Sequence, residues 1–469
     1  MFLSHRRKIA THRLSAGLLG AAALAGCAVG PAYRTPTLAE PTAYKEIDGW
    51  IGAVPADGDE RGDWWTRFAD PTLNALMQQL AASNQNVAAA TAAYAQALAT
   101  VREQRAGLFP VVTLDGGGRR LGGAGSSTTG NNFQASIGVA WEPDVWGRLQ
   151  RAADSADAGA AASVADRGSA LLSARGELAT DYFSLRQSDA QRVLLQATIA
   201  GYQRALQITQ NRYQAGIAPK TDLLQAQTQL ASTQADEAGL ARQRAQFEHA
   251  IAVLTGQAPA NFSLDALPGW QPVLPNFPVG VPSALLQRRP DIAAAERRVA
   301  LANAQIGFAR AALYPSLNLS GSYSSGGRTV AELFSVANSI WSLGLSAAQV
   351  LFNAGATRAR VSGAEAAQEQ AAARYRQTVL TAFESVEDQL AASRVLLLQQ
   401  SLREQASDAA DQTEARALNR YRAGQIGYAE VVTAQVSALS ARRALVQLRA
   451  DRQLTVVALI QALGGGWGP

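Results

Sequence analysis

The chain has 469 residues, 48% of them hydrophobic and 17% charged, so it can bury a core and is not intrinsically disordered. Its formal charge of +5 rests on four basic residues near the N-terminus; 38 basic and 37 acidic residues remain after residue 26, which removes the electrostatic basis for nucleic-acid binding. One Cys and three His exclude a zinc cluster and a disulfide framework, and we expect no metal, no cofactor and no enzymatic site.

Residues 1–26 have the pattern of a bacterial secretory signal peptide, with the basic stretch Arg6-Arg7-Lys8 and an apolar run from Leu14 to Ala25. This run is shorter than the ~20 residues of a membrane-spanning helix. It ends in Leu24-Ala25-Gly26-Cys27, which resembles the lipobox of bacterial lipoproteins. That resemblance implies cleavage before an acylated Cys27, and Ala28 implies sorting to the outer membrane; the alternative is a buried free cysteine. We therefore predict a lipid-anchored chain that extends into the periplasm.

Two segments are rich in Pro, residues 27–73 and residues 257–284. The first also carries the aromatic residues Trp64, Trp65 and Phe68. Because Pro interrupts regular hydrogen bonding, we expect both segments to be irregular. The first is predicted as a lipidated N-terminal segment that wraps the outside of the helices, and the second as a linker.

The rest of the chain is an internal repeat. Asn211-Arg212-Tyr213-Gln214-Ala215-Gly216 matches Asn419-Arg420-Tyr421-Arg422-Ala423-Gly424 at an offset of 208 residues. The first repeat covers 74–256 and the second covers 285–463, followed by a tail at 464–469. Both repeats have one plan, a helix, a strand-like segment, a very long helix, a turn and a returning helix.

The helices are predicted from Ala-rich, Pro-free stretches with apolar residues at spacings of three and four. Each long helix has about 65 residues, or roughly 100 Å at 1.5 Å per residue. Ala-Gly at the end of each is a typical C-terminal cap. A dimeric coiled coil would have the same periodicity, and the pattern alone leaves it open. The predicted ranges are 74–107, 148–214 and 219–255 in the first repeat, and 285–312, 356–422 and 427–463 in the second.

The strand-like segments are 110–146 and 315–352. Both alternate between apolar and small polar residues; Leu317, Leu319 and Tyr323, for example, alternate with Ser316, Asn318, Ser320 and Ser322. This pattern is typical of transmembrane β-strands, two per segment around a Gly/Ser turn, although surface hairpins on a soluble protein remain an alternative. Four strands cannot close a barrel, and open edges are not tolerated in lipid, so the barrel must be shared between chains. Two chains give eight strands around a filled interior, whereas three give twelve strands and an aqueous lumen.

Five motifs carry a resemblance to a known family: Cys27-Ala28-Val29-Gly30-Pro31-Ala32-Tyr33, Trp64-Trp65 with Phe68, Asp70-Pro71 and Leu73, Arg288-Arg289-Pro290-Asp291-Ile292, Tyr314-Pro315 and Leu463-Gly464-Gly465-Gly466-Trp467. On these motifs the chain resembles the TolC-like outer-membrane efflux factor family, in its lipoprotein branch. The resemblance covers essentially the whole mature chain and implies a homotrimer with a shared 12-stranded β-barrel, an α-barrel of long antiparallel helical hairpins, and four strands from each chain. It also implies a tripartite pump with a periplasmic adaptor and an inner-membrane transporter, in which this chain is the passive exit duct.

The resemblance also implies site residues at the turns between the long helices. Asp222 and its counterpart Glu430 are expected to narrow the periplasmic mouth, and their alternative role is to stabilise helix N-termini. Where the resembled branch often has a further Asp, this chain has Thr433, with Gln225 as its counterpart. Residues expected to latch the hairpins are Arg212, Tyr213, Arg420, Tyr421 and Arg422, and those expected to dock the adaptor are Ala215, Gly216, Ile217, Ala423, Gly424 and Gln425.

Three functions are weighed against these features. An efflux duct for small molecules such as drugs, working with a transporter of the resistance-nodulation-division type, accounts for the leader, the helices and the strands. A secretion duct for polypeptides accounts for the same elements. A structural coiled-coil lipoprotein of the envelope accounts for Cys27 and the helices, but not for the paired strand segments, which have no charge between Arg120 and Glu142 or between Glu332 and Arg358.

Overall fold

The computed structural model describes residues 29–37, 43–46, 62–122, 130–275 and 289–465. They belong to two compact units. Among these described residues, the strand unit comprises 29–37, 92–122, 130–165 and 293–377. The hairpin unit, named for its helical hairpins, comprises 43–46, 62–91, 166–275, 289–292 and 378–465. Within the described ranges, no helix combines the length and the apolarity that a membrane span requires. The leader and Cys27 lie outside the described residues.

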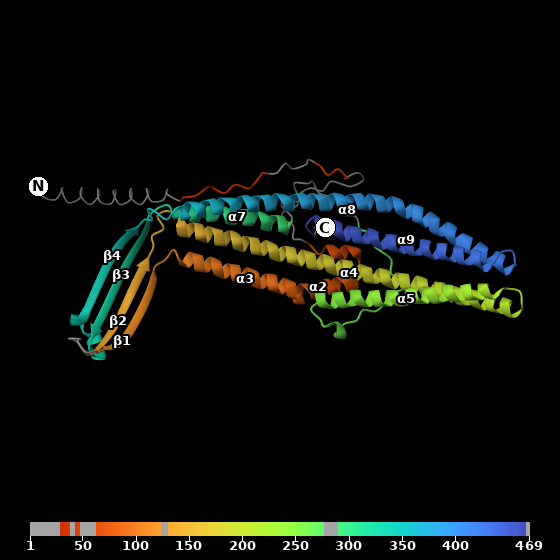
Figure 1. The fold of residues 1–469 in the computed structure, drawn as a ribbon, viewed down its shortest axis with the longest axis horizontal. Helices are drawn as coiled ribbons and strands as arrows, with labels where there is room; N and C mark the ends of the chain where they lie inside the picture. The colour runs from red at the N-terminus through yellow and green to blue at the C-terminus, as the bar shows by residue number, and fades with distance from the viewer. Residues whose placement is uncertain (1–28, 38–42, 47–61, 123–129, 276–288, 466–469) are drawn as a thin grey trace. The chain divides into compact units, whose positions relative to one another are not determined.

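The strand unit contains one antiparallel sheet in the order β1-β2-β3-β4 (Figure 1). Both β-hairpins predicted from the sequence are therefore confirmed. They also pair with each other through β2 and β3, where Ile137 lies opposite Tyr323. The second hairpin is not closed by a simple Gly/Ser turn, because the short helices η3 (Val330–Phe334) and η4 (Val336–Asn338) lie between its strands. The strands are β1 (Val111–Leu121), β2 (Gly130–Trp141), β3 (Ser316–Gly327) and β4 (Ser339–Ala348).

The two faces of the sheet differ in polarity. The pairing places Leu114 opposite Ile137 and Tyr323 opposite Trp341 on one face. Leu114 is 80% exposed and Trp341 75% exposed, so no other described segment of the chain covers this apolar face. Ser322 and Ser342 lie opposite each other on the other face and share a hydrogen bond of 2.8 Å. One apolar and one polar face are what a barrel wall between lipid and water requires.

The helices agree closely with the predicted ranges. The two long helices, α4 (Arg148–Gln214) and α8 (Ala356–Arg422), begin and end at the predicted residues. Each returns through a short turn into α5 (Lys220–Leu254) or α9 (Tyr428–Ala462) (Figure 1). The remaining helix of the second repeat is α7 (Pro290–Ala311).

The single helix predicted over 74–107 is wrong, because the chain forms α2 (Pro71–Ser83) and α3 (Gln85–Ala106) with Asn84 between them. The Asn84 side-chain oxygen accepts hydrogen bonds from the backbone N–H groups of Asn86 and Val87, and thereby caps α3. Its amide nitrogen donates to the Leu254 carbonyl at 2.8 Å. A side chain that satisfies the ends of two helices at once fixes the break at this residue.

The main hydrophobic core lies in the hairpin unit. The aromatic run forms the 3-10 helix η1 (Trp64–Phe68), whose Trp64, Trp65 and Phe68 are 2–3% exposed and pack with residues of α2, α4, α5 and α9. This run is therefore part of the core and not of an outer wrap. Asp70 caps α2 by accepting from Thr72 and Leu73, and the Tyr182 hydroxyl donates to its other oxygen at 2.6 Å. The aromatic and Asp-Pro motif thus joins the N-terminal segment to the first long helix.

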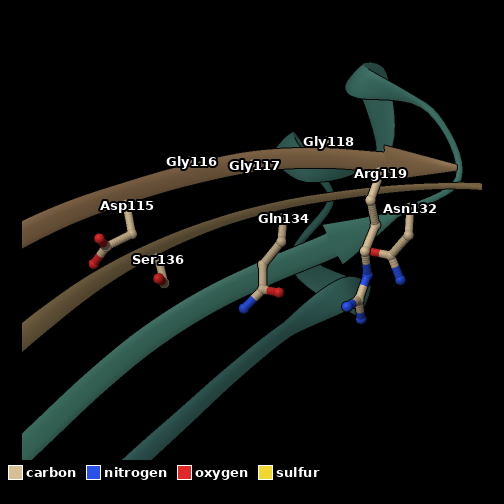
Figure 2. A pocket seen from close by; sticks show the side chains of 8 residues that line it. All are labelled: Asp115, Gly116, Gly117, Gly118, Arg119, Asn132, Gln134 and Ser136. Atoms are coloured by element: carbon tan, nitrogen blue, oxygen red, sulfur yellow. The ribbon is translucent and has the colours of Figure 1, made fainter.

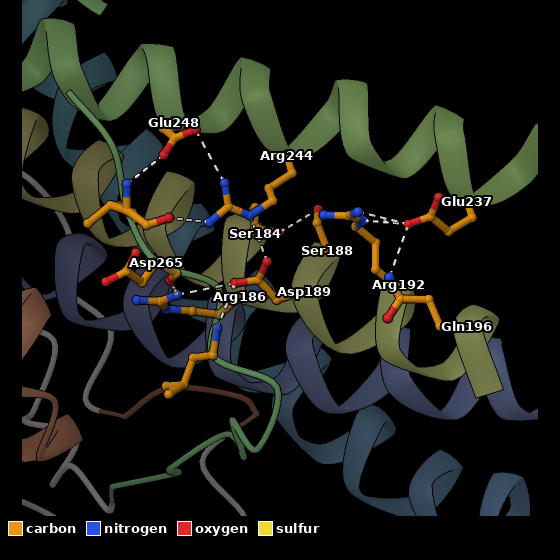
Figure 3. A network of polar contacts seen from close by, with 12 residues as sticks. Ser184, Arg186, Ser188, Asp189, Arg192, Gln196, Glu237, Arg244, Glu248 and Asp265 are labelled. Carbon is orange, nitrogen blue, oxygen red and sulfur yellow. Dashed lines mark hydrogen bonds and ion pairs between the residues drawn. The ribbon is translucent and has the colours of Figure 1, made fainter. Parts of the chain in front are cut away.

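Two polar clamps hold other segments onto the helices. The Arg289 guanidinium forms an ion pair with Asp291 at 2.6 Å and donates to the Ala462 carbonyl at 2.9 Å, which joins the start of α7 to the end of α9. In the second clamp, the buried Asp189 accepts from Arg186 and Arg244 (Figure 3). Those two guanidinium groups also donate to the carbonyls of residues 265 and 264, which fastens this part of the linker to α4 and α5. Removing one partner from such a buried pair typically costs about 3–5 kcal/mol.

Candidate functional site

The two turns between the long helices have one backbone design. Ile217 N–H donates to the Arg212 carbonyl at 2.8 Å, and Gln425 N–H donates to the Arg420 carbonyl at 2.9 Å. These six-residue closures need a left-handed residue, which is Gly216 with φ 72° and Gly424 with φ 75°. The C-terminal caps predicted from the Ala-Gly pairs are confirmed.

The two turns also contact each other within one chain. Arg212 at the end of α4 donates to the Arg422 carbonyl at the end of α8, at 2.9 Å. Its guanidinium carbon lies 4.8 Å from the centre of the Tyr421 ring, within the range of a cation–π interaction. The structure therefore brings together three of the predicted latch residues, one from the first repeat and two from the second.

A small core supports this contact. Tyr421 and Tyr428 are 2% and 1% exposed, and their rings meet edge to face at 5.1 Å. Ala226 and Val431 complete the cluster. The sequence analysis did not include Tyr428 among the residues predicted for the tips. It lies 208 positions after Lys220, so an aromatic residue in the second repeat takes the place of a lysine in the first. This difference between the two repeats, a tyrosine directly after Gly427, was the sequence signal that could have indicated a buried aromatic residue at the second tip.

Asp222 and Glu430 occupy equivalent positions but different surroundings. Asp222 is half-buried, and Glu430 is exposed in the first turn of α9. Burial raises the pKa of the Tyr421 hydroxyl, the negative charge of Asp222 raises it further, and Arg212 opposes the shift. Asp222 therefore belongs to the internal cluster of the tips, whereas Glu430 is free to face other molecules.

The other predicted residues of the tips lie on the surface of the single chain. Ile217 is 66% exposed and Tyr213 is 40% exposed. The hydroxyl of Thr433 donates to the Ala429 carbonyl one turn earlier, at 3.0 Å. The exposed set also contains Gln225, Arg420, Arg422, Ala215, Gly216, Ala423, Gly424 and Gln425.

The chain matches the family described as outer membrane efflux protein over residues 76–257 and 281–465. It is 32% identical over 459 residues to the pyoverdine export outer membrane protein OpmQ of Pseudomonas aeruginosa, covering 95% of this chain and 95% of the relative. It is 29% identical over 455 residues to the cation efflux system protein CusC of Escherichia coli, covering 95% of this chain and 97% of the relative.

Solved structures have the same fold. The outer-membrane channel OprN superposes with a TM-score of 0.87 at 31% identity, covering 94% of this chain and 100% of that one. The MtrE outer membrane channel of Neisseria gonorrhoeae, solved in its open state, superposes with a TM-score of 0.83 at 27% identity, covering 94% of this chain and 98% of that one.

Proposed function

Because this chain belongs to the outer membrane efflux protein family and is an efflux duct of the outer membrane, not an enzyme, we propose that three copies form one passive exit channel, each anchored by lipid at Cys27. The trimer receives small molecules such as drugs from an inner-membrane transporter of the resistance-nodulation-division type, through a periplasmic adaptor. The relatives are named for different cargoes, a cation and pyoverdine, so we assign cargo choice to the transporter.

The observation that carries this proposal is the four-stranded sheet. Each chain leaves one edge of β1 and one edge of β4 unpaired within the described sheet. Unpaired strand edges are too costly in lipid, so neighbouring copies must cover them. Twelve strands from three copies enclose an aqueous lumen, and the polar face with Ser322 and Ser342 supports its assignment to that lumen.

The periplasmic gate is proposed at the tips. Three copies place up to six carboxylates, from Asp222 and Glu430, around one mouth. The contacts of Arg212 with Tyr421 and with the Arg422 carbonyl hold the two hairpins of one chain together, and opening of the mouth requires them to separate. Exposed Tyr213, Arg420 and Arg422 are then available to a neighbouring copy, with Gln225 and Thr433 one turn further along the returning helices.

The adaptor is proposed to dock on the exposed turns 215–217 and 423–425. Their backbone conformation is fixed by the glycine caps, so they present the same surface in every copy. Ile217, at 66% exposure, gives the first turn an apolar contact that the second turn lacks.

Conductance tests the duct. Purified protein in a planar lipid bilayer is expected to conduct ions in discrete steps, and a chain that only bridges the envelope conducts none. Metabolic labelling with palmitate tests the anchor separately. Cys27→Ser is expected to lose the label, and a label that persists in this variant would refute the lipid site.

A further inference from the structure

The polar face of the sheet carries a charged recess. Asp115 and Arg119 on β1 are the charged residues on this face among the described strands, and neither forms an ion pair within the described residues. Gln134 and Ser136 of β2 lie opposite Gly117 and Asp115 in the pairing. Together they line a recess of about 390 Å³ that is within the usual range for small-molecule sites.

Gly117 creates the hollow between the two charges. It lies on the same face as Asp115 and Arg119 because strand residues two apart point to the same side. A Cβ at Gly117 would meet no heavy atom within 4 Å, so crowding does not demand glycine here. The missing side chain leaves the wall open between an acid and a guanidinium group, with Gln134 projecting from the next strand (Figure 2).

The two charges are spaced for one elongated ligand. Four residues along a strand separate the Cα atoms of Asp115 and Arg119 by about 13 Å. A carboxylate at one end favours an ammonium group, and a guanidinium at the other end binds a carboxylate in a bidentate manner. On the next strand Ser136 lies opposite Asp115, Gln134 opposite Gly117 and Asn132 opposite Arg119. Their side chains offer hydrogen-bond donors and acceptors to a polar backbone along the recess.

We propose that this recess is a transit site for elongated zwitterionic solutes, long enough to span the roughly 13 Å between the strand positions of Asp115 and Arg119. The proposal rests on the duct proposed above, since it places the recess on the lumen wall once in each copy. A peptide of four residues has this length when extended, at about 3.3–3.6 Å per residue.

Saturation-transfer NMR with tetra-alanine on the detergent-purified protein tests the recess without requiring current. The wild type is expected to transfer magnetisation to the peptide methyl groups. Asp115→Asn and Arg119→Gln are each expected to weaken binding about threefold, the size of a partly solvated ion pair. Gly117→Leu is expected to abolish binding by filling the hollow while keeping both charges.

Matched controls separate the recess from general charge. Arg120 lies next to Arg119 on the opposite face of β1, so Arg120→Gln is expected to bind like the wild type. N-acetylated tetra-alanine lacks the ammonium group and is expected to bind the wild type and Asp115→Asn equally. Equal binding of tetra-alanine to the wild type, Asp115→Asn, Arg119→Gln and Gly117→Leu would overturn the proposal.

Current recordings distinguish failure of the recess from failure of the duct. Tetra-alanine is expected to cause brief blockades in wild-type channels and fewer in Asp115→Asn. A protein that binds the peptide in the NMR experiment but conducts no current would refute the duct and leave the recess. Channels that conduct without any peptide binding would refute the recess alone.

Discussion

At the scale of single residues, Asp181 on α4 links the fold to pH. Burial raises the pKa of its carboxyl to about 6, and the negative charge of Glu177 adds to the rise. The folded chain therefore holds this proton more tightly than the unfolded chain, whose pKa is near 3.8. It follows that the contribution of Asp181 to stability is lost as pH rises from about 4 to about 6.

Asp181→Asn is accordingly expected to raise the melting temperature at pH 7.5 and to leave it unchanged at pH 4. The gain is at most about 1 kcal/mol, or about 1–2 °C, because solvent screens a side chain that is only partly buried. Thermal unfolding at the two pH values measures it. Asp408→Asn, on the exposed surface of α8, is the matched control for the substitution itself and is expected to leave the melting temperature close to that of the wild type. An equal gain at both pH values would contradict the assignment to Asp181.

Glu430 and Asp222 differ in exposure, and block by a trivalent cation is expected to separate them. Glu430→Gln removes an exposed charge from the proposed mouth and should weaken block from the periplasmic side. Asp222→Asn should weaken it less, since this acid is half-buried beside Tyr421, and it should lower the pKa of that tyrosine. Thr433→Asp should strengthen block. Single-channel currents measure the effect at low salt, because charges further apart than ~8 Å are screened at physiological salt. Equal block of the wild type and Glu430→Gln would place the gate elsewhere.

At the scale of elements, the two tips depend on left-handed glycines. Gly216→Ala and Gly424→Ala meet no steric obstacle within 3.5 Å, so their cost is the backbone penalty of about 1–2 kcal/mol for each residue. The double variant is expected to form folded protein with a lower melting temperature and to lose drug resistance in cells, because the docking turns change shape. Asn tolerates the left-handed conformation better than Ala, so the double variant with Gly216→Asn and Gly424→Asn should retain more of the melting temperature and more of the drug resistance.

Gly239 in the middle of α5 is the matched control for this experiment. It is helical and a Cβ there meets nothing within 4 Å, so Gly239→Ala should stabilise the chain by about 0.5–1 kcal/mol and leave drug resistance intact. Full resistance in the double tip variant would show that the turns do not dock the adaptor.

At the scale of the whole molecule, the sheet predicts the number of copies. The mass of the purified protein in detergent is expected to equal three chains, because three copies supply twelve strands and cover every β1 and β4 edge. The Cys27→Ser protein is expected to have the same number of copies, since the lipid anchors the chain without forming the barrel. A stable monomer with full strand content would contradict the shared barrel.

Local pattern determined much of this protein. The alternation of Leu317 and Leu319 with Ser316 and Asn318 predicts strands with one apolar face, and the structure has that face. The 208-residue repeat predicts two equivalent hairpins, and Gly216 and Gly424 end their long helices as expected. These features are readable because neighbouring residues on one strand or helix decide side-chain direction and backbone conformation by themselves.

Tertiary structure decided the features that depend on distant partners. The break at Asn84 is fixed by a bond to Leu254, 170 residues away, and the aromatic run at Trp64 is buried because α2, α4, α5 and α9 enclose it. Asp222 and Glu430 occupy matching positions in the repeat, yet of the two it is Asp222 that lies beside Tyr421. Tyr421 is buried because residues of both helical hairpins pack around it. Repetition in a sequence copies local conformation, whereas the charge and burial around each copy depend on which other segments pack against it.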